Sequence, residues 1–170
     1  MNKAPRLHIR HAEPGDLPAV LKILNHYILH DHCTFDTEPW SVEQKQPWFV
    51  SCSPGSPYQL LVAILEGKVA AYAHSSRWRP KNAYDITVET TVYVSPAAQG
   101  QGIGMALMER LLSELGGQGL RSAVAGVTQP NPASDHLHLK LGFKKVGTFE
   151  QVGYKFGNFH DVTWYRRRLD

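Results

Sequence analysis

The spacing of hydrophobic residues in the N-terminal part of the chain predicts a short strand followed by two helices. Residues 7–10 resemble a strand, and a turn at 13–16 follows them. Beyond the turn, apolar side chains recur three and four positions apart, as on one face of a helix, at Leu17, Val20, Leu21, Leu24 and Ile28. Asp16 can cap this helix. A second helix is predicted from about residue 39 or 41 to residue 50.

The rest of the chain mixes strand-like and helix-like segments. An apolar run over 58–65 turns at Glu66 and Gly67 into a second run over 68–75, which predicts an antiparallel hairpin. Further strands are expected over 83–94, 122–127, 144–154 and 161–168, and further helices over 104–115 and 132–141. This mixture predicts an α/β fold with a mixed, mostly antiparallel sheet flanked by helices, in one domain over 1–170 with its core at about 7–169.

Composition and charge narrow the class of protein. A length of 170 residues suits one domain, and a hydrophobic content of 42% is ordinary for a globular protein. The net charge of +3 is weak, and the basic cluster at 166–168 ends a strand, so no nucleic-acid partner is expected. No apolar run reaches the length of a membrane span or of a leader, which predicts a cytoplasmic protein without a membrane partner. Cys33 and Cys52 form no metal or disulfide motif, and their roles are left open.

Three alternate glycines in the segment 99–104 lie between a strand-like run and a helix-like run. Glycine lets a ligand touch the main chain, and the first amides of a helix attract anions, so the segment is suited to a diphosphate. No lysine follows the glycines, which excludes the mononucleotide phosphate loop, and their spacing does not fit the dinucleotide fingerprint. A glycine-rich turn without a ligand is the alternative.

Two blocks of sequence resemble those of the GNAT acyl-CoA N-acyltransferases. The segment 99–104 resembles the family signature Gln/Arg-x-x-Gly-x-Gly/Ala, and 131–143 resembles its second block. Within the family, the chain is most similar to phosphinothricin N-acetyltransferases and their relatives that acetylate methionine sulfoximine or sulfone. The segments 34–39, 81–94 and 152–162 carry this closer resemblance, which extends over about residues 9–169.

The resemblance implies a GNAT fold, acetyl-CoA as cosubstrate, no metal, and a homodimer. The implied reaction is acetyl transfer to the α-amine of a small amino acid analogue such as L-phosphinothricin, L-methionine sulfoximine or its sulfone. The amide of Val94 can polarise the thioester carbonyl. Helix capping is the alternative role for Asn131 and Ser134. The residues implied to bind the cosubstrate are Val92, Tyr93, Val94, Gln99, Gly100, Gln101, Gly102, Ile103, Gly104, Asn131 and Ser134.

Glu89 is the candidate general base. It is the one charged residue in the run 86–92, and burial among β-branched neighbours should raise its pKa towards the range useful for a base. The matching glutamate of the resembled subfamily is its proposed base, acting directly or through water. A solvated glutamate that faces outward from the strand is the alternative.

His138 is the second catalytic candidate. The resemblance places it where many members of the family carry a tyrosine that protonates the leaving thiolate, and an imidazole can donate a proton near neutral pH. The alternative is a packing or surface histidine. A metal site formed with Asp135 and His136 is not expected, because positions two apart on a helix do not face the same ligand.

The acceptor site needs cations if the substrate is an anionic amino acid. The basic segment 77–81 supplies them, with a solvated loop as the alternative. The resembled subfamily carries a lysine and then an arginine two residues on, whereas this chain reverses that order, which leaves the substrate preference open. As alternatives, Phe35 is a core aromatic and Tyr93 an ordinary strand residue. The residues assigned to the acceptor are Phe35, Arg79, Lys81, Tyr84, Thr91 and Tyr93.

Two other functions remain open from the sequence. One is acetylation of a different amine, either a protein N-terminus or a polyamine, and the basic segment 77–81 argues against a polycation. The other is a CoA-binding regulatory module without catalysis, against which Glu89 and His138 argue. Release of thiol from acetyl-CoA distinguishes an enzyme from such a module.

Overall fold

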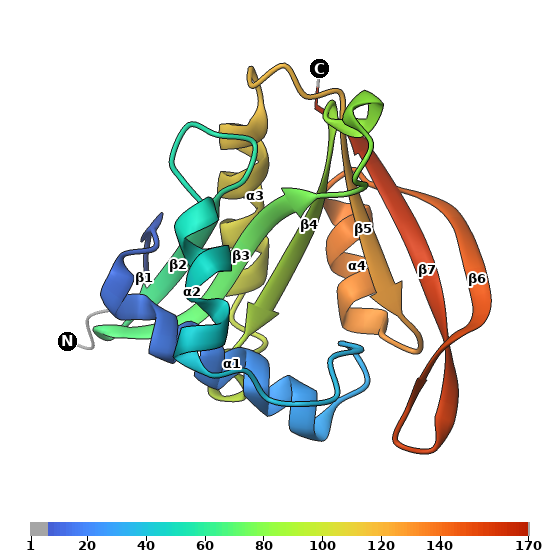
Figure 1. The fold of residues 1–170 in the computed structure, drawn as a ribbon, viewed down its shortest axis with the longest axis horizontal. Coiled ribbons are helices and arrows are strands. Elements are labelled where there is room, and N and C mark those ends of the chain that lie inside the picture. Colours follow the sequence, from blue (N-terminus) through green and yellow to red (C-terminus); the bar gives the residue numbers. More distant parts are fainter. Residues whose placement is uncertain (1–6, 170) are drawn as a thin grey trace.

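A seven-stranded sheet with helices on both faces forms the structure, which is a computed structural model that describes residues 7–169 (Figure 1). The spatial order is β1-β2-β3-β4-β5-β7-β6. Every neighbouring pair is antiparallel except β4 and β5, which run parallel, so the mixed and mostly antiparallel sheet is confirmed. The strands are β1 (Leu7–His11), β2 (Leu60–Leu65), β3 (Lys68–Arg77), β4 (Thr87–Val94), β5 (Ser122–Thr128), β6 (Lys144–Lys155) and β7 (Asn158–Arg168).

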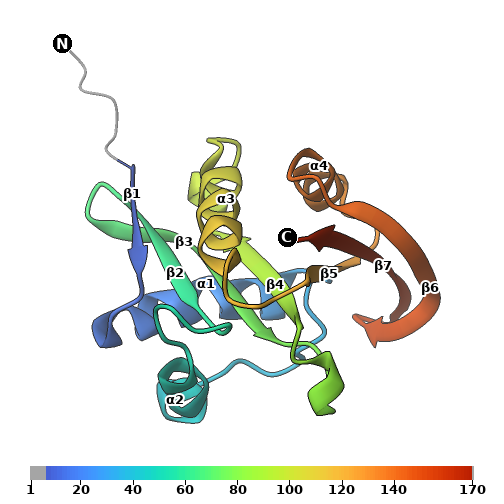
Figure 2. The same ribbon diagram turned by 90° about the horizontal axis from the view of Figure 1, so that it is seen from above.

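The helices cover the two faces of the sheet in pairs. Figure 2 shows α1 (Leu17–His30) and α2 (Val42–Ser51) on one face, with α3 (Ile103–Leu115) and α4 (Pro132–Lys140) on the other. The helical periodicity predicted for the first helix is confirmed, because the apolar residues that define it are all buried. Ser41 begins α2 as expected, since its hydroxyl accepts a hydrogen bond from the amide of Gln44.

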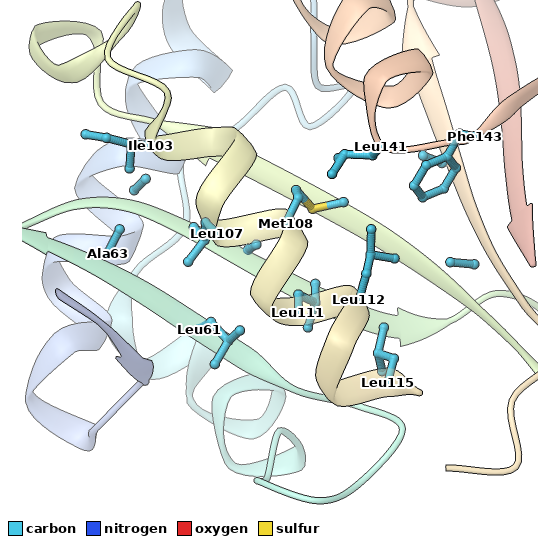
Figure 3. Packing of buried hydrophobic residues seen from close by; sticks show 14 of the residues in the cluster. Leu61, Ala63, Ile103, Leu107, Met108, Leu111, Leu112, Leu115, Leu141 and Phe143 are labelled. Carbon is cyan, nitrogen blue, oxygen red and sulfur yellow. The ribbon is translucent and has the colours of Figure 1, made fainter. Parts of the chain in front are cut away.

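Each face of the sheet has its own hydrophobic core. On one face, leucines of α3 such as Leu107 and Leu111 pack on β2 and β3 residues including Leu61 (Figure 3). On the other, α1 buries residues such as Val20 against Val62 of β2. The cluster under α3 extends over β2 to β5 and reaches Tyr165 of β7, whereas the cluster under α1 lies on β2 and β3 with Tyr93 of β4 packed against it. The strands from β2 to β4 are therefore covered on both faces, which fixes the position of β4.

The strand predicted over 83–94 was wrong at its start, since β4 begins only at Thr87. Residues 82–84 form a short 3-10 turn instead. The Arg77 guanidinium donates hydrogen bonds to Asp85 Oδ1 at 2.7 Å and to Asn82 Oδ1 at 3.1 Å. These side-chain bonds hold the segment in a turn, and the extended backbone resumes after it.

β4 and β5 pair over only a short stretch and then diverge. The pairing joins residues 87–89 of β4 to residues 122–124 of β5, whereas β4 stays paired with β3 as far as Val94. Figure 1 shows the two strands separating towards the end of the sheet near α1. The edge of β4 that faces β5 beyond Glu89 therefore has no strand partner within residues 7–169, and this opening positions the candidate site.

Candidate active site

Glu89 is the last residue of β4 that pairs with β5, so it lies where the two strands diverge. Side chains of a strand alternate between its faces, which puts Glu89, Thr91 and Tyr93 on one face. Tyr93 packs in the cluster under α1, whereas Val92 and Val94 pack against the cluster under α3. The predicted base and acceptor side chains thus occupy one face of β4, and the side chains of the two valines occupy the other.

Burial raises the pKa of the Glu89 carboxyl, and the positive charge of Arg79 partly offsets that increase. The side chain is neither fully buried nor fully exposed. This excludes the fully solvated glutamate that the sequence left as an alternative. The strand pairing also brings the predicted base towards a predicted acceptor cation, because Ser76, which pairs with Glu89, lies three residues before Arg79.

The glycine segment forms an open, uncapped entry into α3. Gly100 and Gly102 have φ angles of 74° and 75°, a conformation that favours glycine, and a Cβ on either would meet nothing within 4 Å. Gly102 is the N-cap of α3 and offers no side chain to its first amides. By contrast, Asn131 caps α4, because its Oδ1 accepts the amide of Ser134. The start of α3 therefore keeps main-chain donors available to an anion.

The other residues of this segment differ in exposure. Gln101 is exposed, whereas Ile103 is 3% exposed and packs in the core under α3. Gly104 is a packing glycine, since a Cβ there would lie 3.3 Å from a methyl of Val94 and 3.4 Å from one of Leu137. Its absent side chain lets α3 approach β4 and α4 closely. The segment thus combines an exposed main chain at its start with a fixed position at its end.

The side chain of Gln99 points to α1. Its Nε2 donates a hydrogen bond at 2.8 Å to the hydroxyl of Tyr27, and that hydroxyl donates to the carbonyl oxygen of Val94. Sequence reasoning missed Tyr27, although the residue continues the apolar face of α1 with a polar tip. The two bonds join the end of β4 to the start of the glycine segment.

The cations of the basic segment 77–81 differ in their contacts. Arg77 forms an ion pair with Asp85 and holds the 3-10 turn, so it does not serve an acceptor. The Arg79 guanidinium lies 5.2 Å from the ring centroid of Trp78, which in turn meets Tyr84 edge-on at 5.2 Å. Trp78 lies within the basic segment, but sequence reasoning gave it no role. Arg79 and Tyr84 are therefore connected through one indole ring, while Lys81 is exposed.

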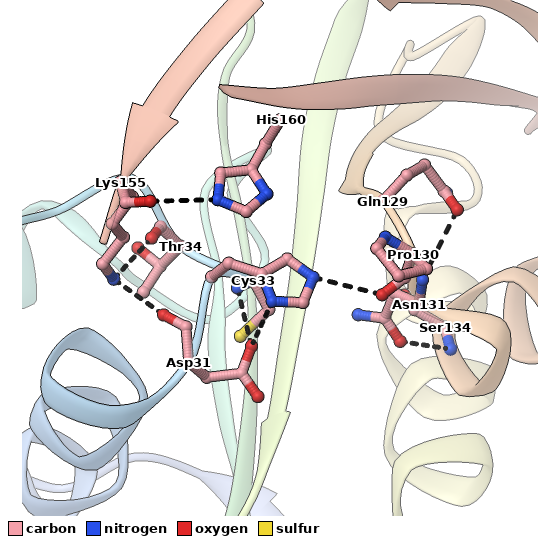
Figure 4. Close-up of polar contacts among 10 residues, drawn as sticks. Asp31, Cys33, Thr34, Gln129, Pro130, Asn131, Ser134, Lys155 and His160 are labelled. Atoms are coloured by element: carbon pink, nitrogen blue, oxygen red, sulfur yellow. Dashed lines mark hydrogen bonds and ion pairs between the residues drawn. The ribbon is translucent and has the colours of Figure 1, made fainter. Parts of the chain in front are cut away.

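The segment that carries Phe35 is held by the β6–β7 hairpin (Figure 4). Lys155 is 4% exposed, and its Nζ donates to the carbonyl oxygens of Asp31 and Thr34, both at 2.8 Å. The ring of Phe35 lies against Gly153, where an added Cβ would come within 2.1 Å of the ring. Phe35 itself is 39% exposed, which excludes the core aromatic that the sequence left open. Lys155 is a second residue that sequence reasoning missed.

Two stacked histidines extend this contact to the loop before α4. The rings of His32 and His160 lie parallel with centroids 4.9 Å apart, and His160 Nε2 lies 3.2 Å from the carbonyl of Lys155. His32 Nε2 lies 3.1 Å from the carbonyl oxygen of Pro130. The segment after α1 thus contacts both the hairpin and the loop that leads to Asn131.

Comparison with known proteins identifies the family. Residues 25–143 match the Acetyltransferase (GNAT) family. The chain belongs to the GNAT acetyltransferases. It is 44% identical to a phosphinothricin N-acetyltransferase of Streptomyces coelicolor, over 96% of both chains. It is 36% identical to an L-methionine sulfoximine/L-methionine sulfone acetyltransferase of Salmonella typhimurium, over 95% of this chain and 94% of the other.

Solved structures agree with this membership. A phosphinothricin acetyltransferase of the GNAT superfamily from Sinorhizobium meliloti, solved in complex with acetyl-CoA, superposes with a TM-score of 0.91 at 32% identity. The match covers 96% of this chain and 88% of that one. The predicted GNAT fold and the prediction of an N-acyltransferase enzyme are both confirmed.

In this acetyltransferase, His138 is a packed residue of α4. It is 3% exposed, and its ring stacks on Tyr165 and meets Phe143 edge-on. Nδ1 lies 2.7 Å from the carbonyl of Ser134, while Nε2 has no hydrogen-bond partner within the described residues. Burial lowers the pKa of the imidazole. The packing role is therefore present in the structure, and proton donation by His138 stays a prediction.

Asn131 has the capping role that the sequence allowed, since its Oδ1 accepts the Ser134 amide at 3.1 Å. Contact of Asn131 or Ser134 with the cosubstrate stays a prediction. Over residues 7–169, no group of three or more His, Cys, Asp or Glu side chains is arranged to hold a metal ion. No helix in the same range is long and apolar enough to cross a membrane.

Proposed function

We propose that this protein is an acetyl-CoA-dependent N-acetyltransferase for the α-amine of a small anionic amino acid analogue, such as L-phosphinothricin or L-methionine sulfoximine or sulfone. The observation that carries the proposal is the position of Glu89, where β4 and β5 diverge, in electrostatic reach of Arg79. Names of similar proteins supply the substrate class, since they act on phosphinothricin and methionine sulfoximine. The opening between the strands is where donor and acceptor would meet.

The residues around α3 fit the cosubstrate. The uncapped amides at the start of α3 and the exposed main chain at Gly100 and Gly102 suit a diphosphate. The unpartnered edge of β4 at 92–94 suits an amide-containing arm, which can add to it as a further strand. When bound, acetyl-CoA supplies the activated acetyl group. Asn131 and Ser134, at the start of α4, would contact the cosubstrate from the side of β5.

The acceptor would lie on the opposite face of β4. Arg79 suits a planar carboxylate, and Lys81 provides a point charge for the second anionic group. Phe35, on a segment fixed by Lys155, covers the acceptor together with Thr91, Tyr93 and Tyr84. The acceptor amine would then lie next to Glu89.

The chain's own groups provide the proton transfers. Glu89 takes a proton from the substrate ammonium, directly or through water, because only a neutral amine attacks a thioester. The amide of Val94 stabilises the carbonyl oxygen as the N–C bond forms and the C–S bond breaks. His138 then donates a proton to the thiolate from Nε2. In neutral His138 the Nδ1 proton is used by the Ser134 carbonyl, so the donor is the imidazolium.

The β6–β7 hairpin favours a homodimer. Six large apolar side chains of this hairpin are at least 56% exposed, namely Val146, Phe149, Val152, Tyr154, Phe156 and Phe159. An exposed group of this kind is typical of an association surface. β6 is also an edge strand, which offers its main chain to a second copy. A cytoplasmic location suits the free Cys33 and Cys52.

Release of free thiol from acetyl-CoA tests the proposal. The purified protein is assayed with L-phosphinothricin, L-methionine sulfoximine and L-methionine sulfone, with spermidine and an N-terminal peptide in parallel. Release that depends on any of the three amino acid analogues supports the proposal. Release only with the peptide or spermidine would assign a different acceptor. Binding of acetyl-CoA without release in any arm would favour the regulatory module. Light scattering of the same sample measures the oligomeric state.

A further inference from the structure

The hydroxyl of Tyr27 connects α1, the end of β4 and the start of the glycine segment. It lies at the last turn of α1, donates to the carbonyl oxygen of Val94 at the end of β4, and accepts the Nε2 hydrogen bond of Gln99. Between Val94 and Gln99 the chain makes only a short 3-10 turn at 96–98. One side chain therefore fixes both ends of the connection from β4 to the glycine segment.

Tyr27 is itself held firmly. It is 9% exposed, and its ring lies 5.3 Å from the ring of Tyr93. Two residues earlier, Asn25 donates to the carbonyl of Trp40 and accepts the Trp40 amide, both at 2.9 Å. These contacts fix α1 to the sheet and to the segment before α2. Because α1 is fixed, the Tyr27 hydroxyl can hold Gln99, and with it the glycines that follow, in one position.

We propose that Tyr27 is a positioning residue for the acyl donor, acting through the main chain of Val94 and the side chain of Gln99. The inference rests on the proposed function, because it concerns the same cosubstrate. Gln99 is a residue that the family signature specifies, and its side-chain amide is used by Tyr27, so its part in binding is to anchor the segment. Without the hydroxyl, the Val94 carbonyl and the Gln99 amide both lose a partner, and the main chain that meets the donor loses its alignment.

The test is substitution of the hydroxyl with the ring kept. Tyr27→Phe should weaken acetyl-CoA binding about tenfold by calorimetry and raise the acetyl-CoA KM by a similar factor, which is the effect of one lost hydrogen bond of this kind. The amino acid KM should stay unchanged. Gln99→Leu should have a comparable effect. The double variant should be no worse than the more affected single variant, because both substitutions break the same connection.

Ser75→Ala is the matched control. Its buried hydroxyl also joins a carbonyl to an amide, donating to Pro57 at 2.8 Å and accepting from Gln59 at 3.0 Å, between β3 and the segment that precedes β2. The control should lose thermal stability comparably while keeping both KM values. Unchanged acetyl-CoA affinity in Tyr27→Phe, or equal changes in both KM values, would overturn the positioning role alone. Failure of the unsubstituted protein to bind acetyl-CoA would overturn the proposed function as well.

Discussion

The glycine segment at 99–104 and the acceptor segment at 31–36 are built in different ways. The glycine segment takes its form from its own residues, because positive φ angles and missing side chains belong to the glycines themselves. The acceptor segment is held by residues far along the chain, since Lys155 is separated from Asp31 by 124 positions. Under the proposed function, binding of the donor would rest on a short motif, whereas binding of the acceptor would depend on tertiary contacts that can change with the substrate.

The largest expected effect is on the rate of acetyl transfer, which would involve ligands bound at both segments. Glu89→Gln should lower kcat by about a hundredfold or more, because the amide cannot take the proton from the substrate ammonium. The acetyl-CoA KM should stay within about twofold, since Glu89 lies on the acceptor face. Steady-state kinetics with both substrates varied measure the two effects.

The pH profile sharpens this prediction. Burial raises the pKa of Glu89, so the base is lost at a higher pH than for an exposed glutamate as the solution is acidified. The acid limb of kcat/KM should therefore lie above the ordinary value of 4.5 and should be absent from Glu89→Gln. Glu109→Gln, on the exposed side of α3, is the control and should retain full turnover. Unchanged turnover in Glu89→Gln would remove this residue from the mechanism.

Arg79→Ala tests whether the proposed acceptor residues act independently of the glycine segment. The amino acid KM should rise about thirtyfold as one charged hydrogen-bonding partner is lost, while the acetyl-CoA KM should not change. A double change, Arg79→Lys with Lys81→Arg, should restore binding but alter the ratio of kcat/KM between phosphinothricin and methionine sulfoximine. Equal increases in both KM values for Arg79→Ala would contradict an acceptor role.

Gly153→Ala tests the contact between the hairpin and the acceptor segment. The new methyl would collide with the ring of Phe35, so the ring must move and the amino acid KM should rise about tenfold. Gly147→Ala on the same strand is the matched control, because its Cβ would meet nothing within 4 Å. Measuring both KM values of both variants isolates the effect. A change confined to the acetyl-CoA KM of Gly153→Ala would contradict the assignment of Phe35 to the acceptor.

His138→Phe should give the smallest effect. Phenylalanine keeps the stacking on Tyr165 but removes the proton on Nε2, and a thiolate of low basicity can leave without a proton, so a few-fold decrease in kcat is expected. Because burial lowers the pKa of His138, the imidazolium form is lost at a lower pH than in an ordinary histidine. The variant should lose a decline in kcat on the alkaline side of that pKa. A profile identical to that of the unsubstituted protein would leave His138 a packing residue only.

Sequence patterns predicted the parts of this protein that are encoded locally. The face of α1, the cap at Ser41 and the glycine segment follow from residues within a few positions of one another. The partial burial of Glu89 follows from its uncharged neighbours, whereas its role as a base stays a prediction. The first residues of the strand predicted over 83–94 failed because side-chain bonds from Arg77 favour a turn there.

Long-range bonds explain what the sequence could not predict. Tyr27 meets Val94 across 67 positions, and Lys155 meets Thr34 across 121. In the sequence, Tyr27 is one more apolar position of a helix, and Lys155 is a cation near a hairpin turn. Only the packing of α1 against β4, and of the end of β6 against the segment after α1, gives their polar atoms a partner.

The short pairing between β4 and β5 is the only place where the backbone bonds of the sheet connect strands β1 to β4 with strands β5 to β7, within the described residues. The bonds lie at residues 87–89 and 122–124. A donor whose amides pair with the free edge of β4 at 92–94 would add backbone bonds beside this connection and make it more rigid. Hydrogen exchange at that edge would then report occupancy directly, and the apoenzyme would be the softer of the two states.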